Sequence, residues 1–409
     1  MTNFDPAAAT AQWLATLSPQ ETARAVAYTH GSHWLILWGF LVSVLVAWII
    51  VRTGLLVAIR SRIERRRRRP VLVSFVVALV YSALSWVLTL PWAAYESWWR
   101  EKQYGLTSQV FGGWLGEAAV GAVISVVVGA LLLTAIYALI RRARRFWWAW
   151  ASGVTAVFIV LGLIVSPLVI EPIFNTYTPA PNGPVRDAVV ALAKQTGTPS
   201  DKIFIYDGSK QSDRYTANVS GLFGSARVAM SDTMFKQGAD LAEVRGVVGH
   251  EMGHYAHVHI LWMVRVLIVL SALGFWLTDR LYPTVRRLLG ARGVGDISDP
   301  AGLPVLALIL AFLGVLATPI GATLTRTLEA DADHFSLVHA NEPDGLSKAL
   351  IKTAEYRAPS PSAVEEFLFY DHPSVENRIR RAMEWKATHM PQGASQGAPQ
   401  VAARQPPRP

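Results

Sequence analysis

Six long stretches that are almost free of charge constrain the fold of this chain more than any other feature. They cover residues 34–51, 71–95, 118–140, 146–170, 260–278 and 300–325, and Arg265 is the one charged residue inside them. Each reaches the roughly 18 residues that a bilayer-spanning helix needs. Only helices and closed barrels satisfy their backbone hydrogen bonds in lipid. The sequence therefore predicts a mainly α-helical protein, a polytopic membrane helix bundle of about six spans.

The more polar chain around these stretches divides into separate regions. We expect an N-terminal lead-in, spans one to four, a polar region, spans five and six, a helical soluble region and a disordered tail. Their ranges are 1–33, 34–170, 171–258, 259–325, 326–389 and 390–409. The lead-in lacks the basic start, apolar run and small-residue cleavage site of a secretory signal peptide. The tail is rich in glycine, alanine, glutamine and proline, which favours disorder.

The polar region mixes helix and strand patterns. Residues 185–196 follow a helical pattern, and residues 203–206 and 227–230 are short runs of strand-forming residues. The segments on either side of the turn at residues 221–224, which begins and ends with glycine, indicate a β-hairpin. This region is therefore expected to combine helices with a small sheet.

Composition limits the chemistry that the chain can perform. It contains no cysteine, which excludes disulfides, thiolate metal sites and cysteine nucleophiles. The net charge is +9, with arginines clustered at residues 60–69 and 141–145, beside the apolar stretches. That position favours contact with acidic lipid head groups over nucleic acid. Any metal must be held by histidine, aspartate or glutamate.

A His-Glu-Met-Gly-His motif precedes the fifth apolar stretch. His250 and His254, four residues apart, would lie on one face of a helix, where they can bind one zinc ion. Glu251 is placed to take a proton from zinc-bound water. Asp240 and Glu243 form an Asp-x-x-Glu variant of a capping box, which predicts that the helix starts just upstream. The alternative interpretation is a helix with two exposed histidines and no metal.

A third ligand is expected at the end of the sixth stretch. A zinc hydrolase needs three protein ligands and one open position for water. Glu329 lies one turn from Arg326 and one turn from Asp333, so the three could share a helix face. We expect Glu329 to bind the metal and Asp333 to hold a ligand histidine by its free ring nitrogen. His334 points about 100° away from Asp333, outside this set; His334 and His259 are the next candidates.

Several motifs, taken in order, resemble those of the type I CAAX prenyl proteases, which are integral-membrane zinc metallopeptidases. The histidine motif with the following His259 is one, and Arg326-x-x-Glu329-x-x-x-Asp333 is another. The others are Leu90-Pro-Trp92, Tyr104-Gly-Leu106, Ile170-Glu-Pro-Ile-Phe174, Tyr206-Asp-Gly-Ser-Lys210, Asn218-Val-Ser-Gly-Leu222 with Arg227 to Thr233, and Asp371-His-Pro373 with Arg378. The resemblance covers about residues 35–385.

The resemblance implies a helix bundle that encloses a chamber, capped by a zincin-like α+β catalytic domain with one zinc ion per chain. A peptide or protein substrate, such as a protein with a prenylated C-terminal tail, would lie as an extended strand along an edge strand. That edge would consist of Asn218, Val219, Ser220 and Gly221. His372 and Arg378 would face the scissile carbonyl and stabilise its developing oxyanion. The chain is expected to be a monomer in the bilayer.

Three functions remain open from the sequence. The first is a CAAX-type processing protease. The second is a quality-control zinc protease for membrane proteins, which the Ala- and Arg-rich composition favours because it is typical of bacteria with high genomic GC content. The third is a non-catalytic membrane scaffold, which the joint presence of Glu251, Glu329 and Asp333 disfavours. Eukaryotic family members have seven spans, whereas the chain before Trp34 is too polar to add a seventh here.

The side of the membrane that the site faces is also open. The positive-inside rule places the arginine-rich loops at residues 52–70 and 141–145 in the cytoplasm. With six spans, the N-terminus, the polar region and the C-terminus then lie on the external face. The family resemblance instead implies a cytosolic catalytic domain. In either case we expect a multi-pass protein of a bacterial cytoplasmic membrane.

Overall fold

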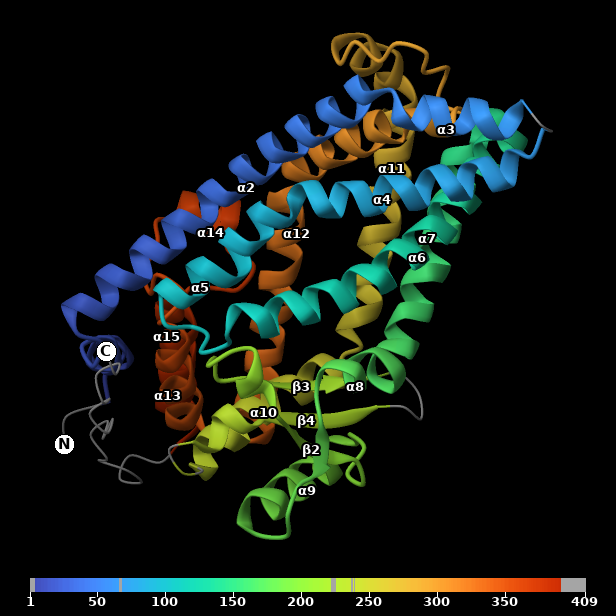
Figure 1. Ribbon diagram of the computed structural model, residues 1–409. Coiled ribbons are helices and arrows are strands. Elements are labelled where there is room, and N and C mark those ends of the chain that lie inside the picture. Colours follow the sequence, from blue (N-terminus) through green and yellow to red (C-terminus); the bar gives the residue numbers. More distant parts are fainter. Residues whose placement is uncertain (1–3, 66–67, 222–225, 237, 239, 391–409) are drawn as a thin grey trace.

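Six long helices and a small sheet at one end of them form the body of the described structure (Figure 1). The computed structural model describes residues 4–65, 68–221, 226–236, 238 and 240–390. The long helices are α2 (Pro19–Thr53), α4 (Pro70–Ala94), α6 (Phe111–Ala143), α7 (Trp147–Val165), α11 (His259–Leu288) and α12 (Leu303–His339). Five stretches have the length and composition to cross a bilayer, and one of them, Phe111–Phe174, contains both α6 and α7. The expected six spans therefore fit.

The first membrane helix begins earlier than the apolar pattern indicates. Ser18 and Glu21 form a reciprocal capping box, and Pro19 occupies the first helical position. The helix then runs without a break to Gly54, whose φ of 64° ends it. Residues 19–33, expected to belong to the N-terminal lead-in, are thus the first turns of α2, because the cap lies well upstream of the apolar run.

Three turns lie at the end of the bundle away from the sheet, and two of them carry the arginine clusters (Figure 1). The turns contain α3 (Leu55–Glu64), η2 (Arg144–Phe146) and η7 (Pro300–Gly302). Arg60 of α3 is hydrogen-bonded to Asp299, just before η7. Arg141 donates to Ser74 Oγ of α4 at 2.9 Å. Three separate turns therefore form one basic end of the bundle.

The sheet has four strands in the order β1-β2-β4-β3. They are β1 (Tyr177–Pro179), β2 (Ile203–Tyr206), β3 (Ala217–Ser220) and β4 (Arg227–Ser231). The antiparallel pairing of β3 with β4 confirms the expected hairpin, whose turn at residues 222–225 lies outside the described residues. Val228 and Met230 of β4 are fully buried against α9 (Pro184–Thr196) and α10 (Leu241–Ala256). This core fixes α10, which carries the histidine motif, against the sheet.

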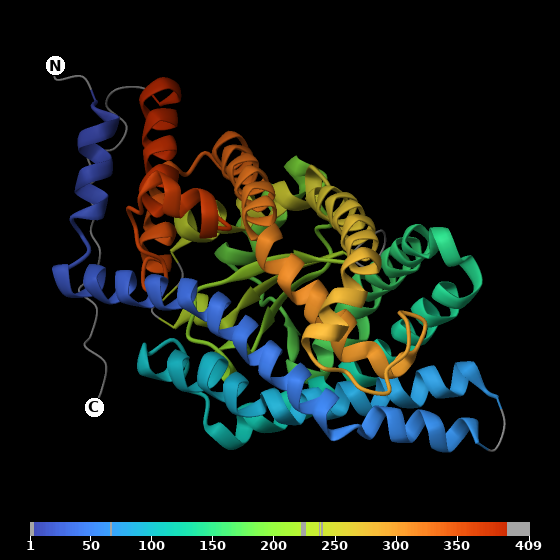
Figure 2. The same ribbon diagram turned by 90° about the horizontal axis from the view of Figure 1, so that it is seen from above.

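The C-terminal helices close one side of the domain. They are α13 (Pro343–Thr353), α14 (Ala363–Phe369) and α15 (Val375–His389). Helix α1 (Pro6–Leu14) lies beside α15, and Trp13, Leu350 and Ile379 share a buried core (Figure 2). The expected disordered tail lies, from residue 391, outside the described residues. Shorter helical segments are η1 (Tyr95–Trp99), α5 (Arg100–Gln103), η3 (Ser166–Ile170), α8 (Glu171–Phe174), η4 (Gly208–Lys210) and η6 (Asp232–Phe235).

Candidate metal centre

Helix α10 is anchored at its start by charged side chains. Asp240 caps it, accepting from the backbone N–H groups of Ala242 at 3.0 Å and Glu243 at 3.3 Å. Only this half of the expected capping box forms. The buried Glu243 carboxylate instead pairs with Lys348, at 2.9 Å, and with Lys352 of α13. The start of α10 is thereby tied to the C-terminal helices.

Small residues let α10 and α12 pack closely. A Cβ atom at Gly253 would lie 3.0 Å from Phe335 Cβ and 3.1 Å from Ala332 Cα, both on α12. Ser336 Oγ of α12 donates to the Gly246 carbonyl at 2.7 Å. A side chain at Gly253 would push the helices apart, since contacts at 3.0 Å are already close. This packing brings Glu329 of α12 to the histidines of α10.

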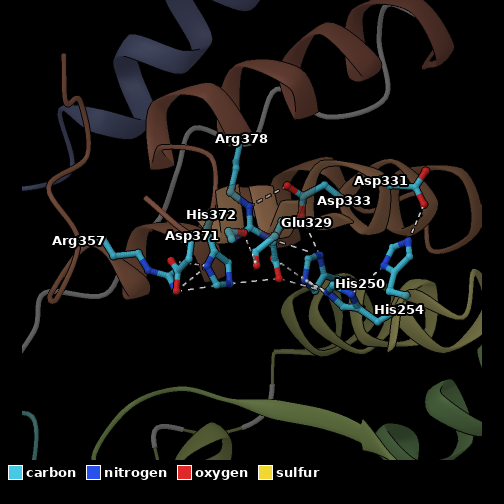
Figure 3. Close-up of polar contacts among 12 residues, drawn as sticks. His250, His254, Glu329, Asp331, Asp333, Arg357, Asp371, His372 and Arg378 are labelled. Carbon is cyan, nitrogen blue, oxygen red and sulfur yellow. Dashed lines mark hydrogen bonds and ion pairs between the residues drawn. The ribbon is translucent and has the colours of Figure 1, made fainter. Parts of the chain in front are cut away.

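Three donor atoms converge between α10 and α12 (Figure 3). The Nε2 atoms of His250 and His254 are 3.2 Å apart. Glu329 Oε2 lies 3.1 Å from His250 Nε2, and Oε1 lies 3.3 Å from His254 Nε2. Bonds of 2.0–2.1 Å in a tetrahedron place ligand atoms about 3.3 Å apart. Glu329 is buried, so its carboxylate faces the two histidines rather than solvent. The set therefore fits a metal ion held by two imidazoles and one carboxylate.

Glu251 lies between the two histidines along α10 but contributes no atom to this cluster. Burial raises the pKa of its carboxyl group, whereas charge on the neighbouring His250 and His254 acts in the opposite direction. A carboxylate with a raised pKa is a stronger proton acceptor. The position and the pKa both suit a general base.

A buried ionic network supports His250 from behind. Its Nδ1 lies 2.9 Å from Asp333 Oδ1, as expected for a carboxylate that orients a ligand histidine. Burial lowers the pKa of His250, but hydrogen bonds to Asp333 and Glu329 outweigh it and raise the pKa to about 10. A metal ion on Nε2 would take the place of the proton there.

Arg378 of α15 completes this network. Its Nε and Nη2 atoms donate to the two oxygens of Asp333 at 2.7 and 2.6 Å. Nη2 also lies 3.8 Å from Glu329 Oε2. Burial acts to lower the pKa of the guanidinium, but the Asp333 carboxylate raises it above its usual range. Arg378 is thus held by Asp333. This contact favours a role in which Arg378 positions Asp333 and, through it, His250.

His372 reaches the centre from the segment before α15. Its Nε2 lies 3.2 Å from Glu329 Oε1. Its Nδ1 contacts Asp371 Oδ1 at 2.8 Å and Arg357 Nη2 at 3.2 Å. Burial lowers the pKa of His372, against the opposing effect of Asp371. Figure 3 shows His372, Asp371 and Arg357 on the side of Glu329 away from the two α10 histidines.

Arg326 serves this segment rather than the metal ligands. Its guanidinium donates to the carbonyl oxygens of Glu366 at 2.7 Å and Tyr370 at 2.5 Å. Of the three residues expected to share a helix face toward the histidines, Glu329 and Asp333 do contact His250. Arg326 instead stabilises the segment that carries His372. Arg357 was not expected at the site, and no local spacing marks it. Asp371 belongs to the Asp371-His-Pro373 motif, but the sequence assigned it no role.

His259 lies behind His254. The two Nδ1 atoms are 2.9 Å apart, and His259 Nε2 lies 2.9 Å from Asp331 Oδ2. His259 therefore supports a candidate ligand instead of joining the three-atom set. His334, the other reserve candidate, is exposed beside the Trp385 ring, with 5.6 Å between ring centroids.

The expected substrate-binding strand, β3, is an edge of the described sheet and lies against α10. It contains Asn218, Val219 and Ser220, and Gly221 follows with a φ of 98°. Asn218 Oδ1 and Ser220 Oγ are buried without a hydrogen-bond partner among the described residues. An edge strand with free polar groups is suited to pairing with another extended chain.

Family models and known proteins match most of the chain. Residues 179–386 match peptidase family M48, and residues 7–176 match the N-terminal region of CAAX prenyl proteases, described as having five membrane helices. Within residues 7–176, the described structure contains four long membrane-capable helices, α2, α4, α6 and α7.

Individual proteins similar to this chain include metalloproteases of the same kind. An uncharacterized metalloprotease of Bacillus subtilis, YhfN, is 26% identical over 372 residues, which is 90% of this chain and 86% of the relative. CAAX prenyl protease 1 of Saccharomyces cerevisiae is 24% identical over 319 residues, covering 73% of this chain and 69% of that protein. The crystal structure of S. mikatae Ste24p superposes with a TM-score of 0.74 at 21% identity, over 90% of this chain and 89% of that one.

The membrane helices, the site between α10 and α12 and the two family matches support one assignment. The chain belongs to peptidase family M48, with the N-terminal membrane region of the CAAX prenyl proteases, and is an integral-membrane metalloprotease.

Proposed function

We propose that the protein is a zinc-dependent endopeptidase with one zinc ion held by His250, His254 and Glu329. The observation that carries this proposal is that the two Nε2 atoms lie 3.2 Å apart and that each lies 3.1–3.3 Å from one oxygen of the Glu329 carboxylate. Zinc in such a site lowers the pKa of a bound water toward neutrality and polarises the substrate carbonyl. Two imidazoles and one carboxylate are ligands of catalytic zinc sites.

The side chains around the centre would move the protons. Glu251 accepts the proton of the attacking water and later passes it to the leaving amine. His372 Nε2 lies next to Glu329 Oε1 and, when it carries a proton, can donate to the oxygen of the scissile carbonyl as charge develops there. Arg378 acts through Asp333, which fixes the ring of His250 so that Nε2 faces the metal.

The substrate would bind as a strand beside β3. Its backbone would pair with the open edge of β3, next to α10, and Asn218 and Ser220 supply buried polar groups that lack partners. Main-chain pairing binds many sequences. This mode therefore suits a protease that recognises an extended segment rather than one folded partner.

The distribution of charge favours a substrate class. Sixteen arginines and four acidic residues lie in residues 52–69, 141–145 and 279–299. Apart from residues 66 and 67, which lie outside the described structure, these segments form the basic end of the bundle (Figure 1). By contrast, residues 95–117, which join α4 to α6 at the sheet end, carry two basic and three acidic residues. Short loops rich in arginine remain in the cytoplasm. If these loops are cytoplasmic, the sheet, the metal centre and both described chain ends would lie on the opposite face.

The side that the site faces distinguishes a protease of prenylated cytoplasmic tails from a protease of segments exposed outside the cytoplasm. Several relatives are named CAAX prenyl proteases, and such a function here would require access to prenylated tails. A tail that stays in the cytoplasm cannot reach an external site. We therefore favour processing or quality control of membrane proteins, with cleavage of segments exposed on the non-cytoplasmic side.

The first prediction concerns the third ligand. Glu329→Ala should lower zinc occupancy strongly, whereas Asp333→Asn should weaken zinc binding by about 10- to 100-fold, as typical for an outer-sphere partner. Asparagine is preferred to alanine because it keeps a polar partner for the buried Arg378. Metal analysis of detergent-purified protein after dialysis at fixed free zinc tests this. Equal zinc content in wild type and Glu329→Ala would contradict the assignment.

A second prediction concerns His372. His372→Ala should reduce kcat by about 10²-fold with zinc retained, as for loss of one oxyanion donor. Arg357→Ala, which removes a neighbour of Nδ1, should have a smaller effect. The measurement is steady-state cleavage of a peptide substrate together with metal content. Unchanged kcat with lowered thermal stability would assign His372 a structural role only.

The third prediction is the orientation in the membrane. Because the chain lacks cysteine, single cysteines can be introduced at exposed positions: Gln195→Cys in α9 and Glu64→Cys in α3. In spheroplasts, a membrane-impermeant maleimide should label Gln195→Cys, and should label Glu64→Cys only after lysis. The reverse pattern would place the site in the cytoplasm and restore the prenylated-tail function as the better candidate.

A further inference from the structure

A second group of metal-binding side chains lies next to the first. His257, His259 and Asp331 each offer one donor atom, and the three atoms lie within 4.8 Å of one another. His259 Nε2 is 2.9 Å from Asp331 Oδ2, and His257 Nδ1 contacts the same oxygen. Both rings therefore converge on one carboxylate oxygen. None of these atoms belongs to the set formed by His250, His254 and Glu329.

The backbone brings the two histidines together. Residues two apart on a continuous helix point about 200° from each other. Val258, between them, has φ 52° and ψ 40°, so α10 ends and α11 begins at this residue. A β-branched residue rarely adopts this left-handed conformation. The break turns His257 and His259 toward Asp331 of α12. The Phe335 ring packs against the His257 ring, with 5.2 Å between the ring centroids.

The chemistry and exposure of the group suit a cation that enters from solvent. The side chains of His257 and Asp331 are 44% and 43% exposed, whereas His259 is 4% exposed. Two imidazoles and a carboxylate are suited to zinc and similar first-row metals. The exposed side leaves space for water ligands, so binding should be weaker than at the enclosed centre.

We propose that His257, His259 and Asp331 form a second, weaker zinc site, and that its occupation inhibits the protease by withdrawing His259 from His254. The binding half of this proposal stands on the cluster alone. The inhibitory half rests on the proposed function, because it needs His254 as a ligand of the catalytic zinc.

The positions of the protons on His254 and His259 give the reason for inhibition. When His254 Nε2 faces the catalytic metal, its proton is on Nδ1, which can donate to His259 Nδ1, 2.9 Å away. His259 then carries its own proton on Nε2 and donates it to Asp331. Zinc at the second site needs the lone pair of His259 Nε2, so the ring's proton moves to Nδ1. Two N–H groups would then face each other, and His254 would lose its support.

Metal stoichiometry tests the binding half. Detergent-purified full-length protein is dialysed at low and at excess free zinc, and its metal content is measured. We expect one equivalent of zinc at low free zinc and two at excess. His257→Ala should stop at one equivalent, and Glu329→Ala should lose the tight equivalent but keep the weak one. His334→Ala, an exposed histidine on α12 outside both groups, is the matched control and should bind like wild type.

Cleavage at increasing zinc tests the inhibitory half. His257→Ala should keep the wild-type rate at low zinc, and the zinc concentration for half-inhibition should rise by about 10-fold or more. Equal sensitivity of wild type and His257→Ala would overturn the inhibitory coupling, and one equivalent in the wild type at excess zinc would overturn the site. If the wild type binds no zinc at low free zinc, while Glu329→Ala still binds the weak equivalent at excess zinc, the second site stands and the proposed function is contradicted.

Discussion

The contact between α10 and α12 is the interaction on which the rest of the site depends. It joins a helix of the sheet domain to a helix that continues from the membrane bundle (Figure 1). Glycine at position 253 and the Ser336 hydrogen bond to Gly246 allow the helices to approach closely. Without that approach, Glu329 could not reach the histidines of α10. The packing of two helices thus determines whether the three donor atoms meet.

Buried charge then fixes the orientation of the donors. Asp333 is bound on one side by His250 and on the other by Arg378, so α10, α12 and α15 share one ionic network. Removing one member of a buried pair typically costs about 3–5 kcal/mol, because it leaves an unpaired charge in a dry site. The network therefore holds the ring of His250 in place, and the three side chains would need little rearrangement to hold a metal ion.

The sequence predicted those parts of the structure that depend on local spacing. Apolar length gave the six spans, and spacings of four residues gave the α10 histidines and the pair Glu329 and Asp333. It did not predict contacts made by residues far apart in the chain. Arg326 was placed on the right helix, but its partners, the carbonyls of Glu366 and Tyr370, lie about forty residues later. Glu243 has the spacing of a capping box, yet two lysines of α13 compete successfully for its carboxylate.

In the proposed mechanism, Glu251 transfers protons at a zinc site to which it contributes no ligand atom. The most direct measurement compares Glu251→Gln with wild type for both zinc content and cleavage of a peptide that the wild type hydrolyses. We expect equal zinc content and a rate lower by about 10²- to 10⁴-fold, the usual contribution of general base catalysis. Turnover close to the wild-type rate in a fully zinc-loaded Glu251→Gln protein would contradict the account.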